Sequence, residues 1–338
     1  YPLSIVNGLT YGTYQFVLTI SNGICSDSRD TVNITIQLPT IAGTIEADAT
    51  VCITSNTGTL SISGFRGSIL QGEVSIDNGS SWLAIANTAN LTSYIYNNLA
   101  TTSQFMAKVQ NGVCPALFTN IVTITVLQEA TIANAGPDQL LCNVTATTLA
   151  ANTPASGTGI WTPLAGNPST ATFTNPNDPA TTVNGLTAGT YQFIWTISNA
   201  LCADSKDTVR IIVYPPTVAG TLANAATVCA NANTGTLTLS GYVSSIIRWE
   251  SSSDNGTTWN NIINTSNTFT YNNLAATIAY RAYVQNSVCP ALYSNTVTIN
   301  TVQPVTIANA GPDQSLCNVT ATTLAANTPA SGTGIWTP

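Results

Sequence analysis

The sequence predicts an all-β protein, a tandem array of β-sandwich domains that short proline-containing linkers join into an extended rod. Segments such as "TVRIIV" and "NTVTINTV" alternate β-branched apolar residues with polar ones, which is the period of half-buried strands. Turn signals separate these segments about every 8–12 residues, as in a sandwich. No stretch carries an apolar stripe of helical period, so strands are expected throughout.

The chain repeats itself over a long distance. The stretch "ANAGPDQLLCNVTATTLAANTPASGTGIWTP" at 133–163 returns at 308–338, with Ser315 in place of Leu140. Likewise "SIDNGSSWLAI" at 75–85 returns as "SSDNGTTWNNI" at 252–262. Repetition at a fixed long period indicates an array of structural modules.

Two module types alternate within this period. One begins with "TIANAGPDQLLC" and ends with "GTYQFIWTISNALCADSKDTVRIIV"; the other contains "DNG" and "VCPAL". We expect these domains: the C-terminal half of the first type at 1–38, the second type at 39–127, the first type at 128–214, the second type at 215–303, and the N-terminal half of the first type at 304–338. The halves at both ends suggest a stretch of a longer array.

Turns and linkers follow from glycine, asparagine and proline. Asp77–Gly79 and Asp254–Gly256 read "DNG", a strong hairpin-turn signal. The linkers "QLPTIAGT", "VYPPTVAGT" and "VQPVT" are short. Pro215 and Pro216 favour an extended connection over a flexible one.

Composition excludes several functional classes. Only 6% of residues are charged, against about 25% in typical domains. The net charge of −7 argues against nucleic acid as a partner, which needs a basic surface. No apolar run approaches the roughly 20 residues of a membrane span, so no membrane insertion is expected.

Histidine is absent from the chain, which has 14 acidic residues. Its absence removes Ser-His-Asp and Cys-His catalysis and histidine-ligated zinc. The sequence therefore predicts a protein that is not an enzyme, with no catalytic residue and no cofactor.

Six of the eight cysteines fall two to a complete module, about 60 residues apart. We predict that Cys52–Cys114, Cys142–Cys202 and Cys229–Cys289 are disulfides, each within one module, and that each stabilises its domain by roughly 4 kcal/mol. Disulfides imply an oxidising compartment outside the cytoplasm. The alternative is reduced, buried thiols in a cytosolic chain. No C-x-x-C occurs, so metal or redox chemistry is less favoured.

Cys25 and Cys317 are left over by this pairing. Their partners are expected outside the chain, in the absent halves of the first and last modules.

Tryptophans recur at fixed positions of the modules. We expect Trp82, Trp259, Trp161 and Trp336 to fill cores, although exposed tryptophans could stack on sugars. Trp249, in "IIRWES", matches the central core tryptophan of a sandwich, and Gly72 replaces it in the other copy. A ligand site would not vanish from one copy, so packing is the better interpretation.

Calcium is the one metal that the acidic residues suggest. Calcium prefers six to eight oxygen ligands. The weak candidate ligands are Asp138, Asp178, Asp204 and Asp207. Aspartates of this kind more often form turns, and nothing in the sequence shows that these four converge.

The motifs "ANAGPDQ…C…GTGIW…NPNDPATTVNGLTAGTYQFIWTISNALC" resemble the PKD-like repeat of giant cell-surface adhesins of Bacteroidota. "GTLTLSGYVSSIIRWESSSDNGTTWNNI…VCPALYSNTVTI" is similar to the Ig-like repeat that alternates with it. The resemblance covers nearly the whole chain and extends to the SprB-like gliding-motility adhesins. We therefore use the names PKD-like and Ig-like for the two module types.

The resemblance implies a non-enzymatic stalk segment of a repetitive adhesin, extracellular and on the cell surface. It further implies type IX secretion and a role in adhesion or gliding motility. Its expected partners are neighbouring repeats, surface motility or secretion machinery, and a polysaccharide or other substratum at a distant tip. The alternative is a subunit of a self-assembling extracellular filament. In it, strand donation between half-modules would complete each domain and Cys317 would bond Cys25 of the next copy.

Overall fold

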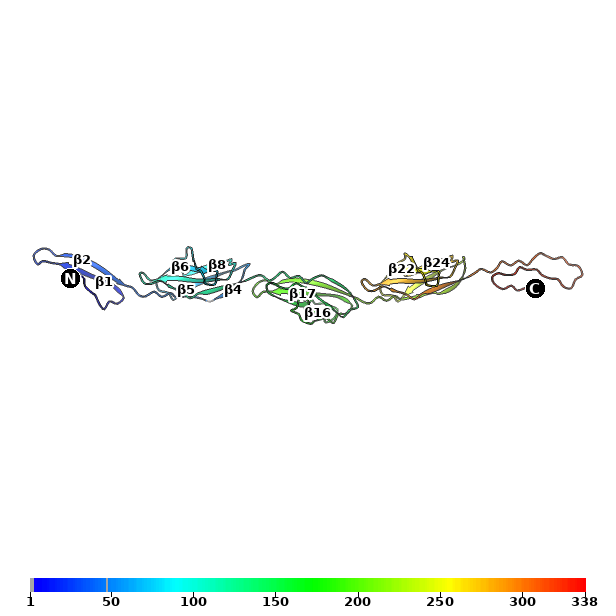
Figure 1. The fold of residues 1–338 in the computed structure, drawn as a ribbon, viewed down its shortest axis with the longest axis horizontal. Coiled ribbons are helices and arrows are strands. Elements are labelled where there is room, and N and C mark those ends of the chain that lie inside the picture. Colours follow the sequence, from blue (N-terminus) through cyan, green and yellow to red (C-terminus); the bar gives the residue numbers. More distant parts are fainter. Residues whose placement is uncertain (1–2, 47) are drawn as a thin grey trace.

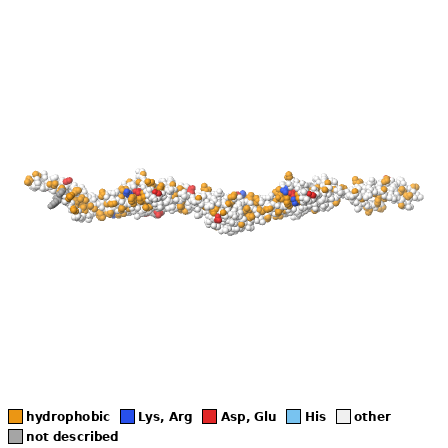
Figure 2. All heavy atoms as spheres, viewed as in Figure 1, with side chains coloured by type: hydrophobic (Ala, Val, Ile, Leu, Met, Phe, Trp, Pro, Cys, Tyr) orange, Lys and Arg blue, Asp and Glu red, His pale blue; other side chains and the backbone are white. Residues whose placement is uncertain are grey.

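The computed structural model describes residues 3–46 and 48–338, and it is an all-β rod. Three β-sandwich modules follow one another in line, with a hairpin at the N-terminal end and an extended loop at the C-terminal end (Figure 1). The described residues contain no helix long and apolar enough to cross a membrane. Charged side chains occupy only small areas of the visible face, mainly over the two Ig-like modules (Figure 2).

The first Ig-like module packs a three-stranded sheet against a six-stranded one. The sheets have the orders β3-β5-β8 and β4-β11-β9-β6-β7, with β10 beside β9. Its core includes Phe105, Ile124 and Tyr96. The strands are β3 (Thr44–Ile45), β4 (Ala49–Cys52), β5 (Thr57–Ser63), β6 (Ser68–Ser75), β7 (Leu83–Ile85), β8 (Ser93–Asn97), β9 (Ser103–Gln110), β10 (Leu117–Phe118) and β11 (Val122–Leu127).

The second Ig-like module repeats this topology strand for strand. Its sheets are β19-β21-β24 and β20-β27-β25-β22-β23, with β26 beside β25. Trp249 is fully buried at the centre of its core, with Leu237 and Ile299. The strands are β19 (Thr221–Ala223), β20 (Ala226–Cys229), β21 (Thr234–Ser240), β22 (Ser245–Ser252), β23 (Asn260–Ile262), β24 (Thr268–Asn272), β25 (Ile278–Gln285), β26 (Leu292–Tyr293) and β27 (Val297–Val302).

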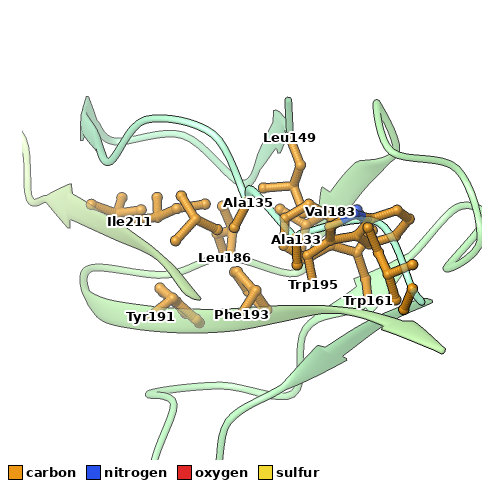
Figure 3. Close-up of a cluster of buried hydrophobic side chains, with 14 residues drawn as sticks. Ala133, Ala135, Leu149, Trp161, Val183, Leu186, Tyr191, Phe193, Trp195 and Ile211 are labelled. Atoms are coloured by element: carbon orange, nitrogen blue, oxygen red, sulfur yellow. The ribbon is translucent and has the colours of Figure 1, made fainter. Parts of the chain in front are cut away.

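The central PKD-like module is a smaller sandwich with the sheet orders β12-β18-β17-β14 and β13-β16-β15. Trp161 and Trp195 lie 5.1 Å apart between ring centroids in its core, beside Phe193 (Figure 3). The hydroxyl of Tyr191 accepts a hydrogen bond from the backbone N–H of Thr187 at 2.8 Å, fixing the turn before β17. The strands are β12 (Gln139–Cys142), β13 (Ala146–Thr148), β14 (Thr158–Pro163), β15 (Thr172–Phe173), β16 (Thr182–Asn184), β17 (Gly189–Ser198) and β18 (Ser205–Tyr214).

The two end segments leave apolar side chains open to solvent. Among the described residues, strands β1 (Gly12–Ile20) and β2 (Ser28–Ile36) pair only with each other, and Leu18 is 65% exposed. Residues 304–338 form no strand, and Trp336 is exposed. Both segments thus lack the second sheet that buries these positions in the central module.

The DNG turns form as the sequence predicts. Asn78 and Gly79 both have positive φ, 57° and 84°, the conformation that asparagine and glycine tolerate best. The hydroxyls of Ser81 and Ser75 and the backbone N–H of Ser81 donate hydrogen bonds to the carboxylate of Asp77 and lower its pKa to about 2. The side chain of Asp77 therefore caps its own turn as an anion.

The predicted burial of the tryptophans is confirmed for Trp161 and Trp249. It is wrong for Trp82 and Trp259, which are only half-buried, and for Trp336, which is 53% exposed. The first two lie in the loop between the DNG turn and the edge strands β7 and β23, and the ring of Trp259 stacks on the guanidinium of Arg281. Trp336 belongs to the end segment that has no facing sheet.

Candidate functional site: the disulfide-bridged module junctions

Both module types share a parallel strand pair that sets which residues lie at the ends of the module. The first strand of the larger sheet pairs parallel with the last strand: β4 with β11, β12 with β18 and β20 with β27. Parallel neighbours point the same way, so the end of the first strand reaches the end where the chain leaves the module. Cys52 accordingly lies beside Leu127, and Cys142 beside Tyr214.

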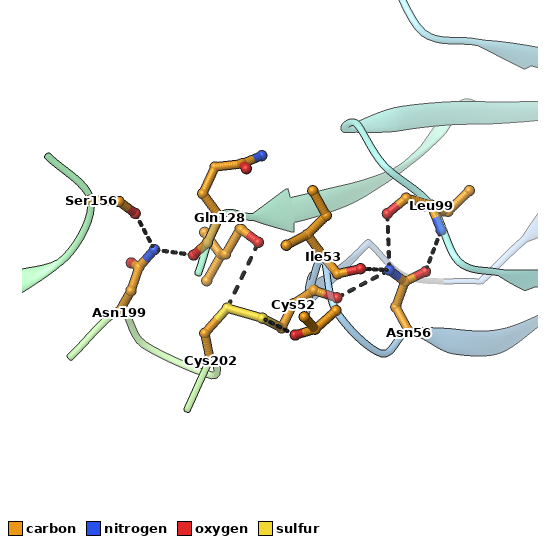
Figure 4. Close-up of a disulfide and its surroundings, with 10 residues drawn as sticks. Cys52, Ile53, Asn56, Leu99, Gln128, Ser156, Asn199 and Cys202 are labelled. Carbon is orange, nitrogen blue, oxygen red and sulfur yellow. Dashed lines mark hydrogen bonds between the residues drawn. A yellow bond between two sulfur atoms is a disulfide. The ribbon is translucent and has the colours of Figure 1, made fainter. Parts of the chain in front are cut away.

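At the first junction, a disulfide joins the first Ig-like module to the PKD-like module (Figure 4). Cys52, at the end of β4, bonds Cys202, in the turn between β17 and β18, with 5.2 Å between the two Cα atoms. The turn is also hydrogen-bonded to the linker, because the Nδ2 of Asn199 donates to the carbonyl oxygen of Gln128 at 2.6 Å. The junction is thus bonded both covalently and by hydrogen bonds.

At the second junction, a disulfide of the same kind joins the PKD-like module to the second Ig-like module. Cys142, at the end of β12, bonds Cys289, in the turn after β25, with a Cα–Cα distance of 5.0 Å. Asn286 donates through its Nδ2 to the carbonyl oxygen of Pro215 at 2.8 Å, and through its backbone N–H to the hydroxyl of Thr217 at 3.1 Å. The half-cystine Cys289 is fully buried.

These bridges correct the predicted pairing within modules. The prediction for Cys52–Cys114, Cys142–Cys202 and Cys229–Cys289 is wrong, because the structure joins Cys52 to Cys202 and Cys142 to Cys289. The two cysteines of one module lie at its opposite ends. Within the first Ig-like module, Cys52 lies beside Leu127 at the exit, whereas the sulfur of Cys114 lies 3.3 Å from the carbonyl oxygen of Leu38 at the entrance.

The turn that carries the second cysteine has one sequence pattern throughout the chain. It reads Asn-x-x-Cys in "NGIC", "NGVC", "NALC" and "NSVC". In three copies the cysteine N–H donates to the asparagine carbonyl, at 3.0, 2.9 and 2.9 Å. This recurrence in both module types is the signal that could have predicted equivalent junctions.

The free cysteines are Cys25, Cys114, Cys229 and Cys317. Each aligns by the repeat with a bonded one: Cys114 with Cys289, Cys25 with Cys202, Cys229 with Cys52, and Cys317 with Cys142.

The match at Cys114 extends to its surroundings. Asn111 donates to the carbonyl oxygen of Leu38 at 2.7 Å and to the hydroxyl of Thr40 at 3.1 Å. These contacts reproduce those of Asn286 at the second junction. The entrance of the first Ig-like module therefore has the same local geometry as a bridged junction.

Three of the four acidic residues singled out for calcium accept hydrogen bonds from backbone N–H groups. Asp138 accepts the N–H of Arg210 at 2.8 Å and pairs with its guanidinium at 3.3 Å. Asp207 accepts the N–H of Ala135 at 2.7 Å, and Asp178 that of Ala180 at 2.9 Å. The structure does not gather these three and Asp204 into one site, and the described ranges contain no cluster of three metal-ligating side chains.

A buried carboxylate with two arginines stands on the sheet of the second Ig-like module. Glu250 pairs with Arg248 and with Arg281, each at 2.7 Å, and its side chain is 3% exposed. The guanidinium carbon of Arg281 lies 3.9 Å from the ring centroid of Trp259 and 3.7 Å from that of Tyr293. The carboxylate and the rings satisfy both cations, so the cluster holds strands together rather than presenting free groups.

Three solved structures match most of the chain at low sequence identity. A titin fragment, "3Ig structure of titin domains I67-I69", is 10% identical with a TM-score of 0.49, covering 80% of this chain and 100% of that one. The eight N-terminal Ig domains of Down Syndrome Cell Adhesion Molecule are 14% identical with a TM-score of 0.49, covering 88% and 44%. A Ca²⁺-stabilised adhesin that "helps an Antarctic bacterium reach out and bind ice" is 14% identical with a TM-score of 0.30, covering 86% and 81%.

The comparison with curated proteins gives no match. A family model does match, at residues 41–128 and again at 218–304. These two segments contain the two Ig-like sandwiches and together make up just over half of the 338 residues. The chain therefore belongs to the family described as "Domain of unknown function (DUF8696)", of which it carries two copies.

Proposed function

We propose that this chain is a non-enzymatic stalk segment of a large repetitive adhesin, located outside the cell on its surface, with a role in adhesion or gliding motility. The observation that carries the proposal is the pair of disulfides across successive module junctions. A bridge between neighbouring modules restricts bending at the joint, which serves a protein that must hold something at a distance from the cell.

The composition supports this proposal. Disulfides persist in oxidising compartments outside the cytoplasm. Repeated modules suit a stalk, because length and stiffness come from repetition rather than from a unique site. The uncharged polar surface, with 6% charged residues, depends little on ion pairs that changing salt would screen.

The experiment combines surface labelling with a mass measurement. Antibodies against residues 128–214 should label intact cells of the source organism, and protease added to intact cells should remove the label. On a reducing, denaturing gel, the labelled polypeptide should run far above the 35.1 kDa of this chain. Labelling only after permeabilisation would overturn the proposal.

The same gel tests the alternative, a filament subunit completed by strand donation. The exposed apolar side chains of β1 and of residues 304–338 favour it, including Leu18 at 65% and Trp336 at 53% exposure. A labelled band near 35.1 kDa, with a ladder of larger species only when reductant is omitted, would support this filament and exclude the long stalk.

A further inference from the structure

We propose that this chain binds a second copy of itself head to tail. Residues 304–338 of one copy and residues 1–38 of the next form one PKD-like module between them, and two disulfides join the copies. The two segments lie at opposite ends of the rod, so the partner of each is a second copy rather than the same chain (Figure 1). By the repeat they correspond to residues 129–163 and 178–215, the two parts of the central module.

The strand order of the central module shows how the two segments fit together. Its larger sheet has the order β12-β18-β17-β14. By the repeat, the inner strands β17 and β18 correspond to the hairpin of β1 and β2, and the outer strands β12 and β14 correspond to parts of residues 304–338. The hairpin of one copy therefore enters between two strands of the other copy and gains backbone hydrogen bonds at both of its open edges.

Apolar side chains that are open to solvent on both segments have buried equivalents in the central module. Four of them are more than half exposed: Leu18, Val32, Leu324 and Trp336. Their equivalents, each at most 1% exposed, are in the same order Trp195, Val209, Leu149 and Trp161. In the shared module Leu18 lies opposite Trp336, at the register where the central module pairs its two tryptophans. Association removes this apolar surface from water, which is the main driving force for binding.

Both segments already hold the local bonds of the complete module. The hydroxyl of Tyr14 accepts the N–H of Thr10 at 2.8 Å, and the equivalent bond of the central module is also 2.8 Å long. The amide of Asn327 accepts the N–H of Asn309 at 2.8 Å and donates to the carbonyl oxygen of Ile307 at 3.0 Å. The equivalent contacts of the central module measure 2.8 and 2.9 Å. The segments are thus preorganised, which lowers the ordering cost of binding.

The first intermolecular disulfide follows from the first junction of the rod. Cys229 is equivalent to Cys52, and Cys25 is equivalent to Cys202. Cys52 and Cys202 are bonded, whereas Cys229 and Cys25 are free. When the hairpin of the second copy completes the shared module, its Cys25 reaches the place that Cys202 has at the first junction. Cys229 of the first copy therefore bonds Cys25 of the second.

The second intermolecular disulfide follows from the second junction in the same way. Cys317 is equivalent to Cys142 and Cys114 to Cys289, and the latter member of each pair is half of one bridge. Cys317 of the first copy therefore bonds Cys114 of the second, where the entrance of the Ig-like module already has the geometry of a bridged junction. Cys317 and Cys25 lie at opposite ends of the shared module and do not bond each other. All four free cysteines of the described residues are then used.

Neither segment supplies the equivalent of residues 164–177. That stretch contains β15, an edge strand of the smaller sheet that pairs two residues with β16. The four-stranded sheet is complete without it, but the shared module is less stable than the central one, so the two bridges hold it together. Because binding is bimolecular, dilute chains stay single and keep their four cysteines free.

The test is oxidation of the purified 338-residue chain, with its two internal bridges intact, in a glutathione redox buffer at about 0.1 µM and about 100 µM chain. At the higher concentration, a denaturing gel without reductant should show a ladder with steps of 35.1 kDa, which reductant collapses. Peptide mapping should find the links Cys25–Cys229 and Cys114–Cys317 in equal amounts. At the lower concentration the chain should run as a single species, with Cys229 open to alkylation.

Two half-blocked variants separate this docking from random thiol oxidation. One carries Cys25→Ser with Cys114→Ser, and the other carries Cys229→Ser with Cys317→Ser. Each alone should run as a single chain, and an equal mixture should stop at the two-chain species, because each variant keeps the cysteines of one end only. A variant that links to itself, or a mapped link between other cysteines, would overturn the proposal.

A second pair of variants tests the insertion of the hairpin. Leu18→Asp leaves the single chain intact, since this side chain is 65% exposed there. In the shared module it would bury an unpaired charge, so the ladder should weaken by roughly tenfold or more. Gln15→Asp is the control, because its equivalent Gln192 is exposed in the central module, and its ladder should match that of the unaltered chain. Equal ladders from both variants would refute the insertion.

The use of this contact on a cell rests on the proposed filament, but the measurement on the purified chain does not. A chain that assembles as expected, while the labelled polypeptide of cells runs far above 35.1 kDa, would refute only the filament. A chain that fails to assemble would refute the head-to-tail contact and leave the surface labelling of a long stalk unaffected.

Discussion

At one core position the two Ig-like modules differ by a whole side chain. Trp249 is fully buried, and its indole N–H donates to the carbonyl oxygen of Ser266 at 2.9 Å. In the first copy, Gly72 takes its place and a cavity of about 40 Å³ lies beside it. The hydroxyl of Thr88 accepts the N–H of Gly72 at 2.7 Å and donates to the carbonyl oxygen of Ile85 at 2.7 Å. The first copy is therefore a sandwich without its central aromatic.

Gly72→Ala should stabilise the first Ig-like module by about 0.5–1 kcal/mol. A glycine inside a strand costs conformational entropy, and alanine removes that cost where it fits. It fits here, because the added Cβ would lie 3.5 Å from the Cδ1 of Ile85 and 3.5 Å from the Oγ1 of Thr88. Hydrogen exchange of the intact chain, read by mass spectrometry on peptides of β6 and β9, should show slower exchange.

Gly159→Ala is the matched control in the central module. Its Cβ would overlap the ring of Trp195, which is fully buried and cannot move aside. This substitution should accelerate exchange in β14 and β17. If both alanines had the same effect, space at the Cβ would not be what distinguishes the two glycines.

At the scale of strands, the sequence predicts the sandwiches well and the bridges badly, for one physical reason. Alternation and turn residues are local, so they identify β17 and β18 and the DNG hairpins directly. The parallel pairing of β4 with β11 is a contact between distant segments, and no period in either strand reveals it. Without that pairing, Cys52 could not be placed at the exit of its module, and equal spacing made a bond to Cys114 the natural expectation.

The Glu250 cluster shows how one copy of a sheet can be reinforced. The first Ig-like module keeps the buried acid as Glu73, but its neighbour is Gln71, which donates to it at 2.6 Å. By the repeat, Met106 stands where the second module has Arg281. Both modules therefore bury a carboxylate at this position, but only the second module pairs it with arginines.

Glu250→Gln should destabilise the second Ig-like module by about 3 kcal/mol, because removing one partner leaves Arg248 and Arg281 half-buried without a counter-charge. Glu73→Gln should be close to neutral, since no arginine loses a partner there. Exchange rates in β22 and β25 for the first variant, and in β6 and β9 for the second, measure the difference. Equal losses in the two modules would show that the ion pairs contribute no stability beyond the hydrogen bonds of the acid.

At the scale of the whole molecule, the junction rather than the module is the repeating unit of the rod. PKD-like and Ig-like sandwiches differ in size and sheet order. In both types, the first strand of the larger sheet ends in a cysteine, next to the point where the chain leaves the module. Both types also carry the Asn-x-x-Cys turn at the end where the chain enters the module. Any module of either type can therefore bond the next, and the rod can lengthen without a new kind of interface.

This equivalence predicts the partner of Cys229. Cys229 ends β20 beside Val302, as Cys52 ends β4 beside Leu127, and it is exposed and free. In a chimera whose residues 303–338 are replaced by a second copy of 128–214, the copied Cys202 should bond Cys229. Thiol alkylation without reductant should label Cys229 in the unaltered chain and leave it unlabelled in the chimera.

The control for this chimera changes only the copied cysteine, by Cys202→Ser in the second copy. It retains the copied Asn199 and its turn, so the module should dock in the same way while Cys229 becomes open to alkylation again. If Cys229 were labelled equally in the chimera and in the control, the junctions would not be equivalent. The rod would then be bridged only at the two joints on either side of its central module. Full protection in the chimera alone would mean that each added module forms one further disulfide to the module before it.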